Sequence, residues 1–420
     1  MTRTGTRTGR VATMRRKALV TLVAAGTAVA ALAANAGSAV ADDEHDDLVR
    51  FATYNASLNR GTEGRLIADL SAPSDAQASA VAEVIQRLAP DVVLINEFDY
   101  DDGHVALRLF QDNYLSRSHN GSTPIEYPYR YTAPSNTGVP SGYDLDNDGT
   151  VGGGNDALGF GQFPGQFGMA VYSRYPIEEH RIRTFQNFRW RDMPGARLPD
   201  DPATSAPADW YGADELAVLP LSSKSHWDIP IDVGGERVHF LVSHPTPPVF
   251  DGPEDRNGLR NADEIRFWAD YVAKGRDARY IYDDEGRRGG LRGSRFVIAG
   301  DQNSDPFDGD SVDGAIQQLL DHRRIDADLI PESEGAVEQA TLQGGANATQ
   351  LGDPRYDTAD FADTTPGNLR VDYVLPSRRL DVVDGGVFWP LSTDPLFRLV
   401  GVFPFPTSDH KPVWLDVRVD

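Results

Sequence analysis

Cysteine is absent from the 420 residues of the sequence, and basic residues are scarce. Without cysteine, the fold contains no disulfide, and the chain offers neither thiolate ligands for zinc nor a cysteine nucleophile. The 40 Lys and Arg residues are outnumbered by 63 Asp and Glu residues, so the formal net charge is −23. This acidity disfavours binding to phosphate backbones at long range and favours divalent cations.

Long apolar runs are also missing, with one exception near the N-terminus. Residues 18–34 are small and apolar, follow a basic head with an arginine pair at 15–16, and precede the run AVA at 39–41. This order is typical of a secretory signal peptide, which we assign to residues 1–41. The arginine pair also fits a twin-arginine export signal. We therefore expect a secreted protein whose folded domain comprises residues 42–420.

The first part of this domain predicts a strand, a helix and a second strand. Residues 50–55 alternate as in a strand and end at Asn55, and the apolar run 92–95 ends just before Glu97. Between the two runs, apolar residues recur at helical spacing over residues 80–88. A carboxylate directly after a buried strand is costly unless it is paired or binds a cation. The alternative is a surface glutamate that begins a loop.

Four further predicted strands end in polar residues or begin beside them. Residues 237–243, 296–299, 370–376 and 412–419 have the alternation or the continuous apolar character of strands, and a helix is predicted over 311–322. The polar residues next to these strands are His244, Asp301, Asn303, Asp372, Asp409 and His410. Two plainer alternatives exist. One is an Asx-type turn after the predicted strand 296–299, and the other is a structural role for the histidines.

Together these residues form a set rich in oxygen ligands, with two histidines. Carboxylates and carboxamides suit Mg²⁺ or Mn²⁺ rather than Zn²⁺. Histidines can neutralise or protonate phosphate oxygens, so the set fits attack of water on phosphorus beside a metal ion. The sequence has neither a G-x-S-x-G turn nor a G-K-[ST] loop, which argues against a serine hydrolase and a P-loop enzyme.

Six short motifs, taken in order, resemble those of the endonuclease/exonuclease/phosphatase superfamily. They are TYN at 53–55, INE at 95–97, SHP at 243–245, GDQN at 300–303, VDYVL at 371–375 and SDHKPV at 408–413. That superfamily includes pancreatic-type DNases, abasic-site endonucleases, inositol-polyphosphate phosphatases and bacterial sphingomyelinases. The resemblance implies a DNase I-like fold, which is a four-layer α/β sandwich of two mainly antiparallel β-sheets packed face to face with helices outside.

The resemblance also implies a metal site and a site for the attacking water. Asn55 and Glu97 match metal-binding residues, and Asp409 is similar to a further carboxylate on the metal side, with Mg²⁺ or Mn²⁺ as the expected cofactor. Asp301 matches the residue that orients or deprotonates the attacking water. Asn303 matches the donor that steadies this water and the transition state.

Other polar residues are expected around the phosphate. By the same resemblance, His244 and His410 flank the scissile phosphate, and Asp372 orients a catalytic group. Lys224 and His226 precede another predicted strand and could reach the phosphate. The alternative for these two residues is a position on the surface.

A second metal site is predicted in the loop that begins at Asp144. Asp144, Asp146 and Asp148, followed by a glycine, match the first half of a calcium loop. Thr150 stands where a backbone carbonyl would bind the ion, and Asp156 comes one residue after the position of the usual bidentate glutamate. We expect structural Ca²⁺ here. The alternative is an acidic, solvated loop.

Two long insertions and one apolar stretch bear on the substrate. Residues 116–168 and 186–220 are irregular, and the second insertion is rich in aromatic residues and is interpreted as facing the substrate. Residues 387–406 carry several aromatic side chains just before the predicted catalytic loop. Bacterial sphingomyelinases have a similar apolar hairpin, so this stretch could contact a membrane surface transiently. The alternative is that these aromatic residues belong to the core.

The leading interpretation is a secreted, metal-dependent phosphoesterase. A phosphodiesterase that acts on lipid headgroups or small organic phosphates is the first expectation, with the phosphate ester as its partner and a monomer as its state. A secreted nuclease that degrades extracellular DNA is the alternative, and the negative net charge argues against it. An alternative of another class is a calcium-stabilised extracellular binding module without catalytic activity.

Overall fold

The computed structural model of the chain describes residues 48–273 and 275–419. The strands are β1 (Leu48–Asn55), β2 (Val92–Asn96), β3 (Tyr129–Tyr131), β4 (Met169–Ser173), β5 (Arg183–Thr184), β6 (His226–Val233), β7 (Glu236–Ser243), β8 (Phe296–Asp301), β9 (Asp372–Pro376), β10 (Asp381–Val387) and β11 (Val413–Arg418). The helices are α1 (Arg65–Leu70), α2 (Ala76–Leu88), α3 (Val105–Phe110), α4 (Ala213–Val218), α5 (Arg256–Val272), α6 (Gln317–Leu320), α7 (Glu334–Gln343) and α8 (Phe397–Val400). The signal peptide assigned to residues 1–41 lies outside the described residues.

The strands form two sheets. The first has the order β10-β11-β1-β2-β4-β3, and the second has the order β5-β6-β7-β8-β9. Only the pairs β1–β2 and β7–β8 are parallel among the strand pairs described, and each is flanked by antiparallel neighbours. The predicted architecture of two mainly antiparallel sheets is therefore confirmed.

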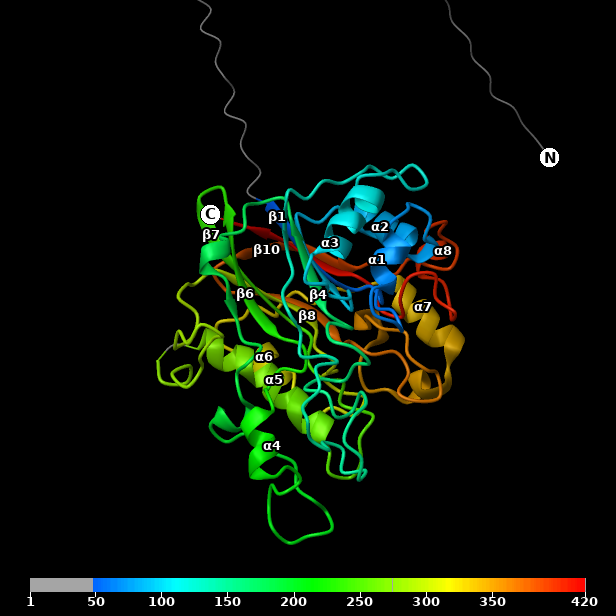
Figure 1. Ribbon diagram of the computed structural model, residues 1–420. Coiled ribbons are helices and arrows are strands. Elements are labelled where there is room, and N and C mark those ends of the chain that lie inside the picture. The colour runs from blue at the N-terminus through cyan, green and yellow to red at the C-terminus, as the bar shows by residue number, and fades with distance from the viewer. Residues whose placement is uncertain (1–47, 274, 420) are drawn as a thin grey trace, which may run out of the picture. The chain divides into compact units, whose positions relative to one another are not determined.

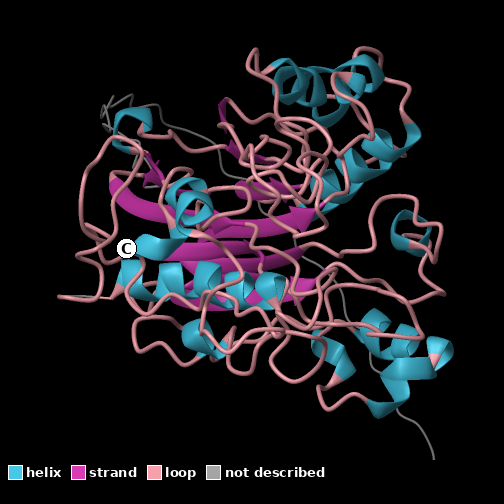
Figure 2. Ribbon diagram, turned by 60° about the horizontal axis from the view of Figure 1, so that its bottom comes forward, coloured by secondary structure: helices cyan, strands magenta, loops and turns pink. Residues whose placement is uncertain are grey.

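The two sheets pack face to face, and helices cover their outer faces (Figure 1, Figure 2). Alternate residues of the strands enter the core between the sheets, where the rings of Phe51 and Phe240 lie 5.5 Å apart between centroids. The opposite residues of the first sheet pack against α1, α2 and α3, and those of the second sheet pack against α5 and α6. This is the four-layer α/β sandwich of the DNase I-like fold.

Several local expectations differ from the structure. The helix predicted over residues 311–322 is wrong in its extent, because only Gln317–Leu320 are helical and the preceding residues form turns. Strand β10 and helix α7 were not predicted, since exposed residues interrupt the apolar pattern of both. In the insertion over residues 186–220, Phe188 and Trp190 are buried against α5, so this insertion contributes aromatic residues to the core.

The topology brings six strand ends to one edge of the sandwich. The carboxyl ends of the parallel pair β1–β2 lie at this edge of the first sheet, and those of β7–β8 lie at the same edge of the second. Strands β9 and β11 run in the opposite sense and begin there. Within the described part of the chain, no helix combines the length and the apolar character needed to cross a bilayer.

Candidate active site

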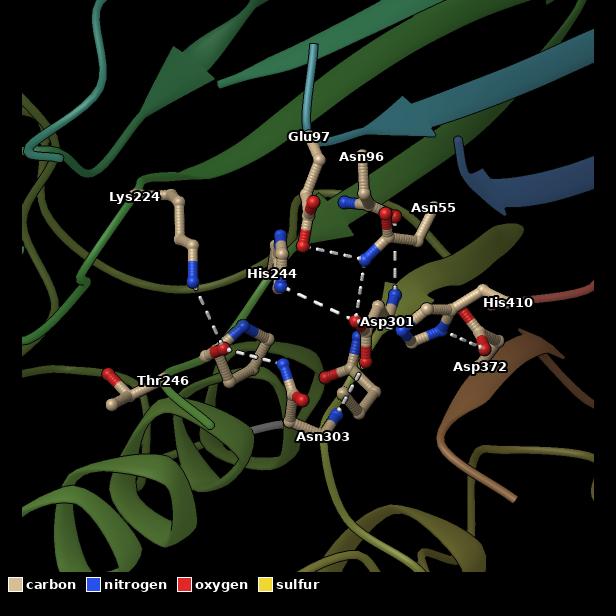
Figure 3. Close-up of polar contacts among 12 residues, drawn as sticks. Asn55, Asn96, Glu97, Lys224, His244, Thr246, Asp301, Asn303, Asp372 and His410 are labelled. Carbon is tan, nitrogen blue, oxygen red and sulfur yellow. Dashed lines mark hydrogen bonds and ion pairs between the residues drawn. The ribbon is translucent and has the colours of Figure 1, made fainter. Parts of the chain in front are cut away.

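Polar side chains from all six strand ends meet at this edge (Figure 3). They come from segments that lie far apart in the sequence, and the shared edge of the two sheets gathers them. The residues are Asn55 at the end of β1, Glu97 after β2, His244 after β7, Asp301 at the end of β8, Asp372 at the start of β9 and His410 before β11. Because rigid strands carry them, their relative positions are well defined.

Asp301 is the centre of this group. Asn55 Nδ2 donates to Asp301 Oδ2 at 3.0 Å, and His244 Nε2 and His410 Nε2 lie 3.4 Å and 3.7 Å from the same oxygen. Burial raises the pKa of Asp301 to about 7, although the charge of His410 acts in the opposite direction. A carboxylate with a pKa near neutrality can accept a proton from water and release it again.

Gly300 allows the approach of β8 to the end of β7. Its φ of +147° is accessible mainly to glycine, and a Cβ atom at this position would lie 2.0 Å from Ser243 O. Any other residue would therefore push the two strands apart. The glycine keeps Asp301 next to His244, which directly follows Ser243.

Glu97 and Asn55 form a second pair beside Asp301. Asn55 Nδ2 lies 3.1 Å from Glu97 Oε1, and Asn59 Nδ2 donates to Glu97 Oε2 at 2.7 Å. Glu97 adopts a left-handed backbone conformation with φ of 58°, which is costly for a residue with a side chain and directs its carboxylate into the site. Burial raises the pKa of Glu97, and the nearby charge of Asp409 acts in the same direction.

The two histidines have opposite charge preferences. Burial, together with the charges of Lys224 and His410, lowers the pKa of His244 well below its usual value, so this imidazole is neutral. Burial also opposes a charge on His410, but Asp372 and Asp301 outweigh it and raise the pKa of His410 well above its usual value. The site therefore contains one neutral and one protonated imidazole around the same carboxylate.

Asp372 fixes the orientation of His410. Its Oδ2 atom lies 2.8 Å from His410 Nδ1 and accepts a hydrogen bond from Thr358 Oγ1 at 2.9 Å. Thr358 Oγ1 in turn accepts from the backbone N–H of Asp372 at 3.0 Å. This places Nε2 of His410 toward Asp301, as an orienting carboxylate does for a catalytic imidazole.

Asn303 and Lys224 meet at the carbonyl oxygen of Pro245 (Figure 3). Asn303 Nδ2 donates to this oxygen at 3.2 Å, and Lys224 Nζ donates to it at 3.5 Å. The surface position considered for Lys224 is wrong, since only 6 % of the residue is exposed. Burial lowers the pKa of Lys224, and the opposing charges of Glu264 and Glu97 limit this effect.

His226 lies away from this group, and a surface position is wrong for it as well. Its Nδ1 is bonded to Ser222 Oγ at 2.5 Å and its Nε2 to Glu264 O at 2.9 Å, and its ring packs against Phe267 and Trp268. Burial lowers the pKa of His226 to about 3. Both nitrogens are occupied within the protein, so the structure gives His226 the contacts of a core residue.

Three functional contacts were missed by reasoning from the sequence. Asn96 Oδ1 accepts from the backbone N–H of Asp301 at 3.3 Å, which links the end of β2 to the end of β8 across the two sheets. Asn59 and Thr358 hold Glu97 and Asp372 as described above. The INE motif contained Asn96, but no pattern distinguished Asn59 or Thr358 from ordinary loop residues.

The comparison with known proteins gives the family. A family model for endonuclease/exonuclease/phosphatase proteins matches residues 52–410. The chain belongs to the endonuclease/exonuclease/phosphatase family. Members of this family are typically metal-dependent hydrolases of phosphate esters. No curated protein matches the chain.

Several solved structures are similar to this member of the family. An endonuclease/exonuclease/phosphatase from Beutenbergia cavernae has 19 % identity over 89 % of this chain and 72 % of its own, with a TM-score of 0.47. Sphingomyelinase C from Streptomyces griseocarneus has 16 % identity over 88 % of this chain and 99 % of its own, with a TM-score of 0.43. Beta toxin from Staphylococcus aureus has 14 % identity over 87 % and 99 %, with a TM-score of 0.40.

The donor atoms of the site fit a divalent cation with oxygen ligands. Asn55, Glu97 and Asp301 supply carboxylate and carboxamide oxygens, which suit Mg²⁺. Ligand atoms of Asp301, Asp372 and His410 also lie within 4.8 Å of one another, although the last two residues are bonded to each other. Asp372 Oδ1 and His244 Nδ1 are buried without a hydrogen-bond partner among the described residues, so both atoms are available to a polar ligand.

The predicted calcium loop has a separate acidic group. Carboxylate oxygens of Asp144, Asp146 and Asp156 lie within 4.8 Å of one another, and the Asp148 carboxylate is not part of this group. Asp156 accepts from the backbone N–H of Leu145 and of Gly152, both at 2.6 Å. The loop is thus held by its own hydrogen bonds, and Ca²⁺ binding stays a prediction.

Proposed function

We propose that this member of the family is a secreted phosphodiesterase that depends on Mg²⁺ and acts on lipid headgroups or small organic phosphates. The observation that carries the proposal is the arrangement around Asp301. A single buried carboxylate contacts Asn55 and lies between a neutral and a protonated histidine. The carboxylate can accept a proton from water, and the protonated histidine can stabilise the negative charge that develops on the phosphate.

The side chains at the site have distinct parts in the proposed reaction. Asp301 accepts the proton of the attacking water, and Asn303 orients this water through its carboxamide. His410, protonated and held by Asp372, neutralises charge that develops on the phosphate oxygens. Nε2 of neutral His244 lies 3.4 Å from Asp301 Oδ2, the oxygen that His410 also approaches, and would help to position this carboxylate.

Asn55 and Glu97 would hold the metal ion, with Asp409 on the same side. Bound Mg²⁺ supplies charge neutralisation and polarisation of the phosphoryl group. Lys224 is buried beside Asn303 and offers a further positive charge to a phosphate oxygen. We include Mn²⁺ as a substitute for Mg²⁺, because both accept oxygen ligands in octahedral geometry.

The proposed substrate class rests on charge and on one exposed apolar segment. The net charge of −23 favours small substrates over polyanionic nucleic acid. Phe403 is 83 % exposed in the loop between α8 and β11, close in sequence to Asp409 and His410. An exposed aromatic residue a few positions before the catalytic loop supports transient contact with a lipid surface. We propose that the enzyme acts there as a monomer.

The test compares the chain from Asp42 with an Asp301→Asn variant. Both would be assayed with Mg²⁺ and with chelator on a chromogenic phosphodiester, a chromogenic monoester, plasmid DNA and phospholipid liposomes. We expect metal-dependent turnover that falls about 10³-fold in the variant, since the isosteric amide cannot accept a proton. Asp310→Asn, which changes an exposed aspartate in the following loop, is the matched control and should retain full turnover.

The substrate profile decides between the functions considered. Highest turnover on the diester or the liposomes supports the proposal, and highest turnover on plasmid DNA would support the nuclease alternative. Equal rates for Asp301→Asn and the wild-type chain would contradict the assignment of Asp301. Metal binding by a folded chain without turnover on any of the four substrates would support a binding module instead.

A further inference from the structure

A hollow lined by arginines lies at the end of the second sheet that is opposite the candidate active site. It has a volume of about 190 Å³ and is bordered by Ser294, Arg323, Arg324, Arg378 and Arg379. Strands β8 and β9 connect the two regions, because Asp301 pairs with Asp372 at the catalytic end and Val297 pairs with Pro376 at the other. We call this feature the arginine hollow.

The backbone holds the two arginine doublets together. Ile325 and Ser377 form an antiparallel bridge, and the N–H of Arg378 donates to Arg324 O at 2.9 Å. The N–H of Ser377 also donates to Phe296 O at 2.7 Å, which ties the pair to the start of β8. Main-chain hydrogen bonds therefore place four guanidinium groups around one hollow, despite the repulsion between like charges.

The positive charge of the hollow is only partly compensated. Arg378 lies 3.8 Å from Asp326 and 3.2 Å from Asp328, whereas the guanidinium of Arg324 donates to the carbonyl oxygens of Gly293 and Val272. In the described part of the chain, neither of the other two arginines forms an ion pair. Burial lowers the pKa of Arg324, and the positive charges of Arg323 and Arg379 lower it further.

A neighbouring cavity extends this basic region. It has a volume of about 260 Å³, and its lining includes Arg237 and Arg292, the latter only two residues from Ser294 of the hollow. Several of its arginines are paired with acids, as Arg237 is with Glu178. Arg183 and Arg287 are likewise paired with Asp283, so the uncompensated positive charge lies mainly in the arginine hollow itself.

We propose that the arginine hollow is a binding site for a tetrahedral oxyanion, namely a phosphate group carried by a small ligand or free in solution. Planar guanidinium groups present paired N–H donors that match phosphate oxygens. Two arginines without acidic partners, and a third bonded only to carbonyl oxygens, leave positive charge available. The hollow is separate from the catalytic residues, so this inference is independent of the proposed function.

The test is calorimetric titration of the full chain with inorganic phosphate and with pyrophosphate, in the presence of chelator to exclude metal-dependent binding at the catalytic residues. Wild-type protein is compared with Arg323→Ala/Arg379→Ala, whose side chains are exposed and make no ion pairs among the described residues. We expect the double variant to bind about tenfold more weakly, since two charge-assisted contacts are lost. Tighter binding of pyrophosphate than of phosphate would identify a ligand with linked phosphate groups, and the reverse order would identify free phosphate.

The matched control is Arg117→Ala/Arg418→Ala, which removes the same charge from two exposed arginines elsewhere in the chain. This control should bind phosphate as the wild-type protein does. Equal affinity in the Arg323→Ala/Arg379→Ala variant and the wild type, or no binding by the wild type, would overturn the proposal. Turnover of a chromogenic diester should be unchanged in both variants, so loss of the oxyanion site is distinguishable from failure of the proposed enzyme function.

Discussion

At the scale of single residues, the neighbours of the two buried histidines decide their charge. The positive charges of Lys224 and His410 act on His244, whereas His410 is bonded to Asp372 and also lies near Asp301. The same burial therefore produces a neutral ring in one case and a protonated ring in the other. Environments that separate pKa values in this way assign acid and base roles to similar side chains.

The substitution Asp372→Asn tests this division. Asp372 is the largest charge that raises the pKa of His410, so its loss should lower that pKa. His410 would then lose its proton at lower pH, and the alkaline limb of the activity profile should move to lower pH. We also expect turnover to fall about 10- to 100-fold, because the imidazole loses its orienting partner.

The measurements are a pH–rate profile on a soluble diester and the NMR titration of His410. Asp381→Asn, at the exposed end of β10, is the control and should leave both unchanged. An unchanged alkaline limb in Asp372→Asn, with lower turnover, would mean that the proton on His410 is not required.

At the scale of secondary-structure elements, a buried carboxylate connects α2 to α8. Glu83 of α2 accepts hydrogen bonds from Arg398 Nη1 at 3.0 Å, Arg87 Nε at 2.8 Å and Asn120 Nδ2 at 2.7 Å. Burial disfavours the carboxylate, but these hydrogen bonds more than offset it and lower the pKa of Glu83 to about 2. The α8 segment, which precedes the catalytic loop, is thereby fixed to the helix layer.

This contact predicts a pH-dependent contribution to stability. The folded-state pKa lies below the ordinary value, so the contribution is full above about pH 4.3 and is lost as the pH falls toward 2. Glu83→Gln should reduce the free energy of unfolding by about 1–2 kcal/mol at pH 7, after allowance for solvent screening, and by less at pH 3.

Urea unfolding at the two pH values measures this difference. Glu63→Gln changes an exposed glutamate for which no such network exists among the described residues, and it should have little effect at either pH. A loss in Glu83→Gln that is the same at pH 7 and pH 3 would show that packing, not the charge, is responsible.

The loop between α8 and β11 provides a second prediction at this scale. Phe403 is exposed and lies edge to face with Phe405, whose ring is 4.6 Å from Lys411 Nζ. If this loop contacts lipid, Phe403→Ser/Phe405→Ser should lower turnover on liposomes about fivefold or more, through the loss of apolar contact. Turnover on the soluble diester should stay near the wild-type value.

Leu342→Ser is the control for this experiment, because it removes an exposed apolar side chain from α7. Co-sedimentation with liposomes measures binding separately from turnover. Unchanged activity of the Phe403→Ser/Phe405→Ser variant on liposomes would contradict the proposed membrane contact.

At the scale of the whole molecule, the net charge of −23 predicts that small and polyanionic substrates respond differently to added salt. Turnover of a small diester involves few long-range interactions, so kcat/KM should change little when salt is raised from about 50 to 300 mM. Binding to DNA releases counterions and would weaken steeply over the same range. A steep loss of plasmid cleavage with added salt, together with high activity at low salt, would favour the nuclease alternative.

The sequence by itself determined the fold class and most of the strands that carry the site. Short apolar runs that end in Asn55, Glu97, His244 and Asp301 appear in the structure as β1, β2, β7 and β8. This prediction was possible because strand periodicity and the motifs at strand ends are local properties of the chain. The local pattern predicted α6 with the wrong length, because this helix is short, and it missed α7 and β10, because exposed residues interrupt their apolar pattern.

Only the tertiary structure decided which residues act together. Asn96 supports Asp301 across the two sheets, Thr358 holds Asp372 from a distant loop, and Lys224 is buried beside Asn303 while its neighbour His226 enters the core. These outcomes depend on contacts between segments separated by up to hundreds of residues, and on which face of a strand a side chain occupies. Residue type and spacing along the chain contain neither kind of information, because burial and partners are set when the two sheets pack together.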